Sequence, residues 1–244
     1  MQVCCNSVQR GVSLSGVYLG INVTNENRPI RLGAVHALLN SIQPTQTAFE
    51  KHWASADVAH LLDGSLYLDR SRGTATEAEL SARIGRLIRY SASTGIDGIL
   101  FTGSFFGEAV RQARKEIDIP VLASFDGLIA RACTLDAPLE VIATAPESVR
   151  LLVTELEAEA VRLKKRLQVS GCAVSNAMDA LIAGDATRHD QLVLEQVEKT
   201  APDAIILFAQ FSMERVLAQS NVRRRVPVIG PAGEGVRRLL NLVG

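Results

Sequence analysis

Two segments of the chain repeat one order of residue types, and this repeat limits the possible folds more than any other feature. The first segment begins at Asp97 and reads DGILFTGSFFGEAVRQARKEIDIPVLA. The second begins at Asp203 and reads DAIILFAQFSMERVLAQSNVRRRVPVIG. Each has an apolar strand, a turn of small or polar residues, a helix and a Pro-Val strand. The apolar runs RLGAVHA at 31–37 and LEVIATA at 139–145 also correspond. We interpret the chain as a duplication of one α/β unit.

Strand-like apolar runs alternate with segments of helical periodicity along the chain. The expected strands cover residues 30–36, 57–62, 96–104, 119–124, 139–144, 168–174, 203–210 and 226–230. The expected helices cover 45–53, 77–94, 105–116, 146–165 and 189–200, with a short helix and loop over 176–188. Such alternation is typical of βαβ units and a parallel sheet. We predict an α/β fold of two similar Rossmann-like halves, each with a short parallel sheet, and a ligand cleft between them.

The repeat also indicates where the halves divide. We expect residues 30–125, with 215–244 contributing, to form the first half, and residues 126–214 to form the second. Residues 1–29 are rich in Ser, Asn, Gly and Val, and they end in the turn-prone stretch VTNENRP. We interpret residues 1–29 as an N-terminal extension without clear chemistry.

Composition argues against several classes of protein. The 26 basic side chains balance 26 acidic ones, so neither nucleic acid nor membrane is an expected partner. No apolar run approaches the ~20 residues of a membrane-spanning helix, and no basic segment followed by a long apolar core begins the sequence, so neither a membrane span nor a secretory signal is expected. Cys4, Cys5, Cys133 and Cys172 show no CxxC spacing, so no metal site is expected. We expect a cytoplasmic protein in which Cys133 and Cys172 are buried small residues, and a second copy of the chain is a candidate partner.

Several motifs occur in a characteristic order along the chain. They are AVHALLNSIQP, LLDGSL at 61–66, the turn FTGSFFGEAV, the stretch GDATRHD and the segment LFAQFSM. In these motifs and in its two-half organisation, the chain resembles the aspartate/glutamate/hydantoin racemase superfamily over residues 30–240. The resemblance implies isomerase-type chemistry on a small carboxylate, without a cofactor.

The resemblance also implies a mechanism. Racemisation removes a proton from a weakly acidic carbon and returns one on the opposite face, so two acid–base groups must flank that carbon. In the family, two cysteine thiols at the strand-to-helix turns of the two halves fill these roles. Here the corresponding residues are Gly103, in Thr102-Gly103-Ser104, and Ala209. Because neither side chain titrates, this sequence lacks the two-thiol mechanism.

Three interpretations of the function stay open. The chain is an isomerase that uses other bases, a cofactor-independent decarboxylase of a malonate-type acid, or a non-catalytic protein that binds a small acid. Arylmalonate decarboxylase, in the same superfamily, is similar in having Gly at the first position. It keeps the second cysteine, however, which this chain lacks.

The candidate ligand contacts lie at the two turns of the repeat. In open α/β sheets, ligands bind beyond the carboxyl ends of the strands, so the turns are expected to face one ligand. Hydroxyl groups and backbone N–H groups there suit a carboxylate, although such residues also serve as helix caps. The candidate substrate-binding residues are Thr102, Gly103, Ser104, Ala209, Gln210 and Ser212.

Neighbouring strand ends supply further candidates. His36 ends the first strand, and it is a candidate catalytic base because histidine titrates near neutrality. The alternative is a strand-end histidine whose partners are backbone groups. Pro44 and Thr45 begin the next helix, and Asp63 ends the second strand, so these three are candidate substrate-binding residues. A cap or turn is the alternative role of Asp63.

His189 is the second candidate catalytic residue. It lies in GDATRHD with Asp185 and Asp190, and a histidine beside a carboxylate can act as a general base. The alternative is that Asp185 caps the following helix while Arg188 pairs at the surface. The basic run at residues 223–225 is expected to form a solvated loop.

Overall fold

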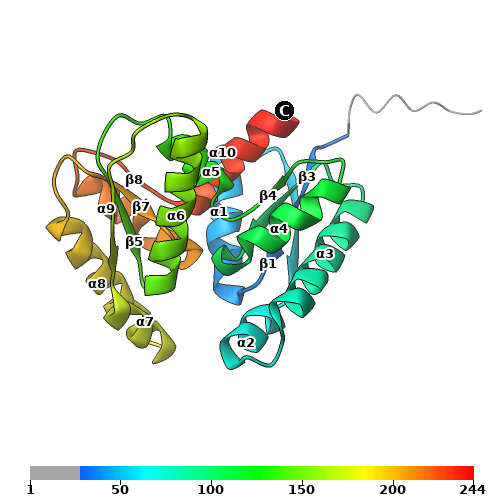
Figure 1. Ribbon diagram of the computed structural model, residues 1–244, viewed down its shortest axis with the longest axis horizontal. Helices are drawn as coiled ribbons and strands as arrows, with labels where there is room; N and C mark the ends of the chain where they lie inside the picture. Colours follow the sequence, from blue (N-terminus) through cyan, green and yellow to red (C-terminus); the bar gives the residue numbers. More distant parts are fainter. Residues whose placement is uncertain (1–27) are drawn as a thin grey trace, which may run out of the picture.

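The computed structural model describes residues 28–244. The expected extension over residues 1–29 lies outside the described residues except for Arg28 and Pro29, as do Cys4 and Cys5. The described residues form two parallel four-stranded sheets, with strand orders β2-β1-β3-β4 and β6-β5-β7-β8. Helices cover both sheets, and the two halves lie side by side (Figure 1). The identical strand order confirms the predicted α/β fold of two similar halves.

The strands are short and the helices connect them. The strands are β1 (Arg31–His36), β2 (Asp57–Leu62), β3 (Gly98–Thr102), β4 (Val121–Leu122), β5 (Leu139–Ala143), β6 (Val169–Ala173), β7 (Ile205–Phe208) and β8 (Val228–Ile229). The helices are α1 (Ile42–His52), α2 (Ser65–Arg72), α3 (Glu77–Ser93), α4 (Gly107–Ala113), α5 (Asp126–Ala132), α6 (Pro146–Arg162), α7 (Ser175–Ile182), α8 (Ala186–Lys199), α9 (Leu217–Val222) and α10 (Pro231–Val243). Four 3₁₀ segments join them, η1 (Leu39–Ser41), η2 (Ser104–Phe106), η3 (Arg114–Glu116) and η4 (Phe211–Val216).

Local signals in the sequence set several of these boundaries. Thr76 caps α3 through the Glu79 N–H, and the Glu79 carboxylate accepts from the Thr76 N–H in return. Pro146 occupies the first turn of α6, where a missing N–H costs no helical hydrogen bond. Each expected strand is present. The helices α2, α5 and α10 were not predicted, because α2 and α5 are short and α10 begins with Pro, Ala and Gly.

The last helix of each half packs on the other half. Helix α5 follows β4 of the first sheet, yet Leu128 belongs to the hydrophobic core of the second sheet. Helix α10 follows β8 of the second sheet, yet Val236 packs with Leu100 of the first. The two helices meet at Gly127, where an added Cβ would lie 2.3 Å from the Glu234 carbonyl oxygen. This exchange fixes the two halves against each other.

The predicted boundary at residue 215 needs a correction. Residues 215–230 were expected in the first half, but β8 pairs with β7 and completes the second sheet. The duplication gives the reason, because each unit needs its own fourth strand beyond its third. Only α10 returns to the first half. Among residues 28–244, no helix has both the length and the apolar character needed to cross a bilayer.

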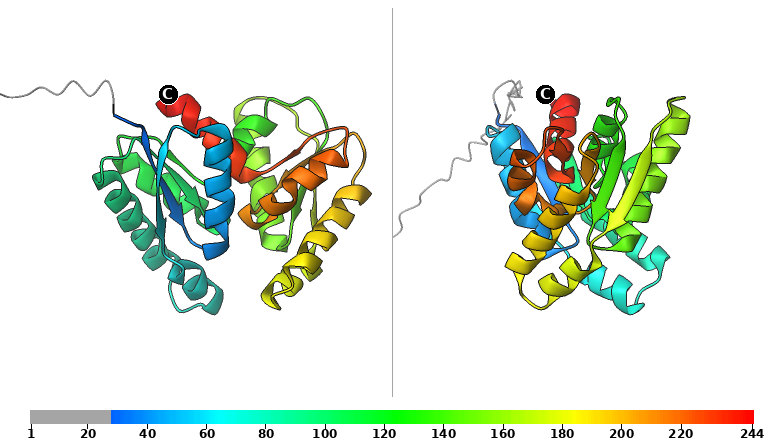
Figure 2. Two further views of the ribbon diagram at one scale, coloured as in Figure 1. Left: turned by 180° about the vertical axis from the view of Figure 1, so that it is seen from behind. Right: turned by 90° about the vertical axis from the view of Figure 1, so that its left-hand side faces the viewer.

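All strand pairs within each sheet are parallel, so the carboxyl ends of the strands in one sheet share an edge. Helices α2 and α7 lie at one end of the molecule, one on each half, and α10 lies towards the opposite end (Figures 1 and 2). The central strands are β1 and β3 in the first sheet and β5 and β7 in the second, and all four are largely buried. Their carboxyl ends carry the residues of the candidate site.

Candidate active site

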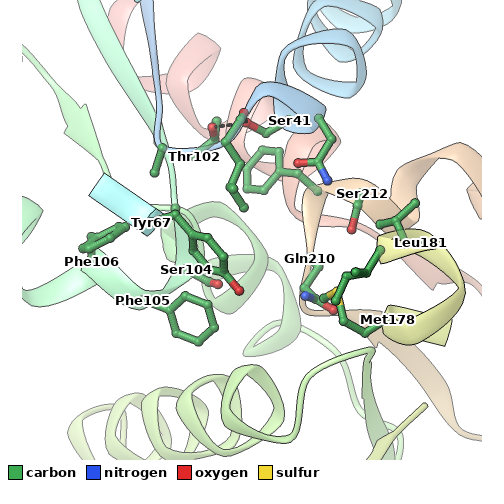
Figure 3. A pocket seen from close by; sticks show the side chains of 16 residues that line it. Ser41, Tyr67, Thr102, Ser104, Phe105, Phe106, Met178, Leu181, Gln210 and Ser212 are labelled. Atoms are coloured by element: carbon green, nitrogen blue, oxygen red, sulfur yellow. Dashed lines mark hydrogen bonds between the residues drawn. The ribbon is translucent and has the colours of Figure 1, made fainter. Parts of the chain in front are cut away.

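A cavity of about 250 Å³ lies between the two halves. It receives residues from the ends of β3 and β7, from the turn after β1, and from α2 and α7 (Figure 3). Its walls are formed by Ala37, Leu38, Asn40, Ser41, Tyr67, Thr102, Gly103, Ser104, Phe105, Phe106, Met178, Leu181, Ile182, Gln210, Phe211 and Ser212. Such a volume suits a small molecule, and its position fits the binding place expected of parallel α/β sheets.

The two turns that face each other across this cavity are structural counterparts. Gly103 is the residue before η2, and Gln210 is the residue before η4, both in extended conformation. The sheet register agrees, because Ile99 pairs with Val121 in the first sheet as Ile206 pairs with Val228 in the second. Gly103 lies four residues after Ile99, and Gln210 lies four residues after Ile206, so Gly103 corresponds to Gln210. The repeat in the sequence matches Gly103 with Ala209 instead.

The one-residue difference explains where Ala209 lies. Ala209 is fully buried and packs in the core of the second sheet with Leu207, and it does not line the cavity. Its counterpart in the first half is Thr102. Gln210 instead reaches the cavity from the second half, opposite Ser104 (Figure 3).

Gly103 is closely packed. An added Cβ would lie 2.8 Å from Phe101 Cε1 and 3.0 Å from both Ala37 Cβ and Phe106 Cδ2. Its N–H donates to Ser124 Oγ at 2.6 Å, so this backbone donor is already used. Any larger residue at position 103 therefore requires its neighbours to move.

A buried hydrogen-bond cluster stands behind the wall of the first half. His36 is fully buried at the end of β1 and is not itself a cavity-lining residue. Its Nδ1 lies 2.7 Å from Thr102 Oγ1 and 3.1 Å from Ser41 Oγ, and both of these residues line the cavity. Its Nε2 lies 2.8 Å from His60 Nδ1. His36 is thus separated from the cavity by the side chains of Thr102 and Ser41.

The buried position keeps His36 uncharged. Burial, and secondarily the neighbouring His60, lowers the pKa of His36 to about 3. Histidine therefore stays neutral here at pH 7, with one protonated and one bare ring nitrogen. Its bare ring nitrogen can therefore accept a hydrogen bond from a neighbouring hydroxyl group.

In the second half, the counterpart of Gly103 is Gln210, whose side chain ends in an amide. Gln210 Oε1 accepts hydrogen bonds from the Thr144 N–H at 2.6 Å and from Thr144 Oγ1 at 2.8 Å. These two bonds fix which end of the amide is oxygen, and they leave the Nε2 donor for the cavity. Ser212 adds a hydroxyl group on the same wall (Figure 3). This half can orient a ligand but offers no titratable group.

The remaining walls are mainly apolar. Phe105, Phe106 and Tyr67 lie on the side of the first half, and Met178 and Leu181 on the side of the second (Figure 3). Of the residues that line the cavity, Tyr67 is the one with a titratable side chain. Within residues 28–244, no group of three or more His, Cys, Asp or Glu side chains is placed to hold a metal ion.

Solved structures show the same architecture. An allantoin racemase from Klebsiella pneumoniae has a TM-score of 0.67 at 15% identity, covering 88% of this chain and 87% of that one. A glutamate racemase from Bacillus anthracis has a TM-score of 0.65 at 12% identity, covering 87% and 80%. An aspartate racemase from Picrophilus torridus has a TM-score of 0.64 at 11% identity, covering 87% and 93%. The chain shares the fold of these allantoin, glutamate and aspartate racemases. In sequence, it matches no protein-family model and no curated protein.

Within this racemase fold, the cavity brings together most of the candidates at the two turns. Thr102, Gly103, Ser104, Gln210 and Ser212 all line it. These residues were found because the repeat places them directly after the central strands. His36 lies behind them, held by side chains rather than by backbone groups.

Three candidates near the first half do not reach the cavity. Thr45 is buried within α1, where its hydroxyl donates to the Ser41 carbonyl at 2.7 Å. Pro44 faces a separate groove beside α10. Asp63 accepts from the Ser65 N–H at 3.0 Å and pairs with Arg83 at 2.9 Å, so it holds the turn into α2. The residue at the start of α1 that does line the cavity is Ser41, which precedes the expected Pro44 and Thr45 in the sequence.

His189 also lies away from the cavity. It is fully buried in α8, with Nδ1 2.8 Å from Asp190 Oδ1 and no partner for Nε2. Asp190 in turn accepts from Arg215 Nε at 3.0 Å. Asp185 caps α8 through the Arg188 N–H, as the alternative interpretation expected. The structure thus separates this histidine from the other candidates.

The cavity-lining residues on α2 and α7 were not predicted. Tyr67 lies on α2, while Met178, Leu181 and Ile182 lie on α7. Their apolar or aromatic character is ordinary for helices, so no signal in the sequence sets them apart. Asn40 and Ser41 were also missed, although they follow directly after the strand that ends at His36.

Two other expectations turn out differently. Cys133 is buried, with its pKa raised by burial, but Cys172 is only half-buried on the edge strand β6. Arg224 is not a solvated loop residue. Its guanidinium donates to the carbonyl groups that end α8, including Val197 at 3.0 Å and Thr200 at 3.1 Å.

Proposed function

We propose that the chain is a cofactor-independent enzyme of isomerase type, which moves a proton on a small molecule bound between the two halves. The observation that carries the proposal is the contact between Thr102 Oγ1, at the cavity wall, and the His36 Nδ1 behind it. A neutral histidine there can take a proton through the hydroxyl and return it. Thr102 directly precedes Gly103, the position at which the resemblance implies an acid–base residue of the first half.

The proposed substrate is a small carboxylate or a related carbonyl compound. No Lys or Arg side chain is among the cavity-lining residues, so a carboxylate would depend on hydroxyl, amide and backbone donors. Ser104, Gln210 and Ser212 are the side chains that can supply such donors. The apolar walls favour a ligand with an apolar part.

A non-catalytic small-acid-binding protein is the second candidate. It is favoured by the scarcity of titratable groups at the wall, where Tyr67 is the single one. In this case the hydroxyls and the Gln210 amide would hold the ligand, and the His36 cluster would serve packing alone. A ligand would then bind without any exchange of its protons.

Proton exchange in D₂O, followed by NMR, distinguishes the two. The probes are L-aspartate, L-glutamate, allantoin, 5-benzylhydantoin and phenylmalonate, each tested for binding and for loss of the signal at the acidic carbon. We expect at least one probe to exchange or decarboxylate with the wild-type protein. Binding of a probe without either change would support the binding protein instead.

A variant pair ties any activity to this cavity. Ser212→Phe fills the cavity from the second half and is expected to abolish exchange. Ser175→Phe is the matched control, since Ser175 is exposed at the start of α7 and does not line the cavity. Equal loss in both variants, or in neither, would contradict this location of the site.

A further inference from the structure

We infer that Thr102, His36 and His60 form a proton relay that links the cavity to the surface. Thr102 lines the cavity, His36 is fully buried and His60 is exposed on β2. The two successive contacts measure 2.7 Å and 2.8 Å. The inference rests on the proposed function and adds the route by which the proton leaves the cavity.

The two imidazole rings are joined in line. Their planes differ by 17° and their centroids are 5.1 Å apart. With His36 Nε2 and His60 Nδ1 only 2.8 Å apart, the rings meet edge to edge through one N–H···N bond. A proton can pass along such a bond without movement of either ring.

The outer end of the relay fixes its direction. Gln46 Nε2 donates to Glu50 Oε1 at 2.9 Å, which leaves Gln46 Oε1 as an acceptor for His60 Nε2 at 2.9 Å. His60 therefore carries its hydrogen on Nε2 and accepts at Nδ1. The hydrogen on His36 must then lie on Nε2, so His36 Nδ1 is bare and faces Thr102.

The Ser41 hydroxyl supports this assignment. It donates to the Leu38 carbonyl at 2.6 Å, so its single hydrogen is already used. Thr102 Oγ1 lies 2.7 Å from His36 Nδ1 and 2.8 Å from Ser41 Oγ, and we assign its hydrogen to His36 Nδ1, the nearer acceptor. The cavity hydroxyl that shares a proton with the relay is that of Thr102.

The relay also solves the problem of charge in a buried site. When a proton reaches His36 Nδ1, the Nε2 proton of His36 moves to His60 Nδ1. His36 remains neutral throughout, and the positive charge appears on the exposed His60. Burial lowers the pKa of both histidines, so the neutral state is the resting state at pH 7.

During abstraction, the proton leaves the ligand and moves along the relay by linked transfers. A carbon–hydrogen bond of the ligand breaks, its electron pair stays on the carbon, and the proton passes to Thr102 Oγ1. The hydroxyl proton of Thr102 moves to His36 Nδ1 at the same time, so no free alkoxide forms. The added proton ends on His60, and the reverse sequence returns a proton to carbon. No oxidant or reductant takes part.

The test substitutes His60→Gln. Glutamine accepts from His36 Nε2–H and donates to Gln46 Oε1, but it cannot take up a proton. We expect exchange into the active probe to fall about tenfold or more, with KM and Tm unchanged. His52→Gln is the matched control, because His52 ends α1 outside the relay and should keep the wild-type rate. A His60→Gln variant that exchanges at the wild-type rate would overturn the relay.

A second measurement does not depend on activity. Two-bond ¹H–¹⁵N spectra of the histidine rings at pH 7 report which nitrogen is protonated. In the wild type, we expect the hydrogen on Nε2 in both His36 and His60. In Gln46→Leu, His60 Nε2 loses its acceptor, so we expect His60 to populate both tautomers. A hydrogen on His36 Nδ1 in the wild type would overturn the relay. If no probe exchanges but these tautomers are found, the proposed function fails while the hydrogen-bond order stands.

Discussion

Glu214 Oε1 accepts a hydrogen bond from the Ala232 N–H at 2.7 Å, which joins η4 of the second half to the start of α10. Burial raises the pKa of Glu214 to about 7, although the backbone N–H groups of Ala232 and Gly233 act in the opposite direction. A carboxyl group therefore titrates near neutrality at the junction where the two halves are held together.

Glu214 makes the stability depend on pH. Because its pKa is raised from 4.5 in the unfolded chain, the folded protein keeps the proton that the unfolded chain loses. This contribution is complete below pH 4.5, is lost as the pH rises through 7, and amounts to up to about 3 kcal/mol. In Glu214→Gln, a neutral amide keeps the acceptor for Ala232 and the contribution stays constant.

Urea unfolding of both proteins between pH 4.5 and 8.5 measures the effect. We expect the difference in free energy of unfolding, wild type minus Glu214→Gln, to fall steadily across pH 4.5–7 and to level off above. Taking the difference removes other titrating groups, such as His36, which destabilises the fold at low pH. A pH-independent difference would show that Glu214 does not titrate in this range.

The close packing around Gly103 predicts a cost for any side chain there. Gly103→Ala places a Cβ against Phe101, Ala37 and Phe106, and we expect a loss of about 1–3 kcal/mol. Gly64→Ala is the matched control, since an added Cβ there meets nothing within 4 Å and its φ of −65° suits any residue. Chemical denaturation of both variants checks the prediction. Equal stabilities would contradict the tight packing.

Gln210 provides a test of the ligand's charge. In Gln210→Glu, the carboxylate can still accept both hydrogen bonds from Thr144, so we expect little change in Tm. The donor that faces the cavity is lost, however, and a negative charge takes its place. An anionic ligand should bind at least tenfold more weakly, whereas an uncharged ligand should lose much less. Titration calorimetry with whichever probe binds the wild type measures both, and unchanged binding of an anion would exclude contact with Gln210.

The sequence predicted which residues lie at the strand ends, and the strand order then decides which of them meet. His36 and Thr102 end adjacent strands in register, so their proximity follows from the order of the first sheet. Gln210 and Ser212 follow β7 by the same argument. An alignment of the repeat on Asp97 and Asp203 matches Gly103 with Ala209, one residue away from the structural match with Gln210. Small and apolar residues on both sides of the turn fit either alignment equally well.

The sequence could not predict what depends on packing between distant segments. Met178 on α7 reaches the cavity only because α7 packs beside the edge of the second half, and nothing in its local sequence reports that. Similarly, His60 lies on an edge strand among ordinary residues. Its role becomes visible only when the strand register brings it beside β1, within reach of His36.

The most direct test of the central account compares Thr102→Val with Thr45→Val. Both threonines are buried and both side chains keep their shape, but only Thr102 lines the cavity and contacts His36. The measurement is the rate of deuterium incorporation into the active probe in D₂O. We predict that Thr102→Val lowers this rate about 100-fold or more, that Thr102→Ser retains most of it, and that Thr45→Val leaves it close to wild type. Wild-type exchange by Thr102→Val would contradict the account.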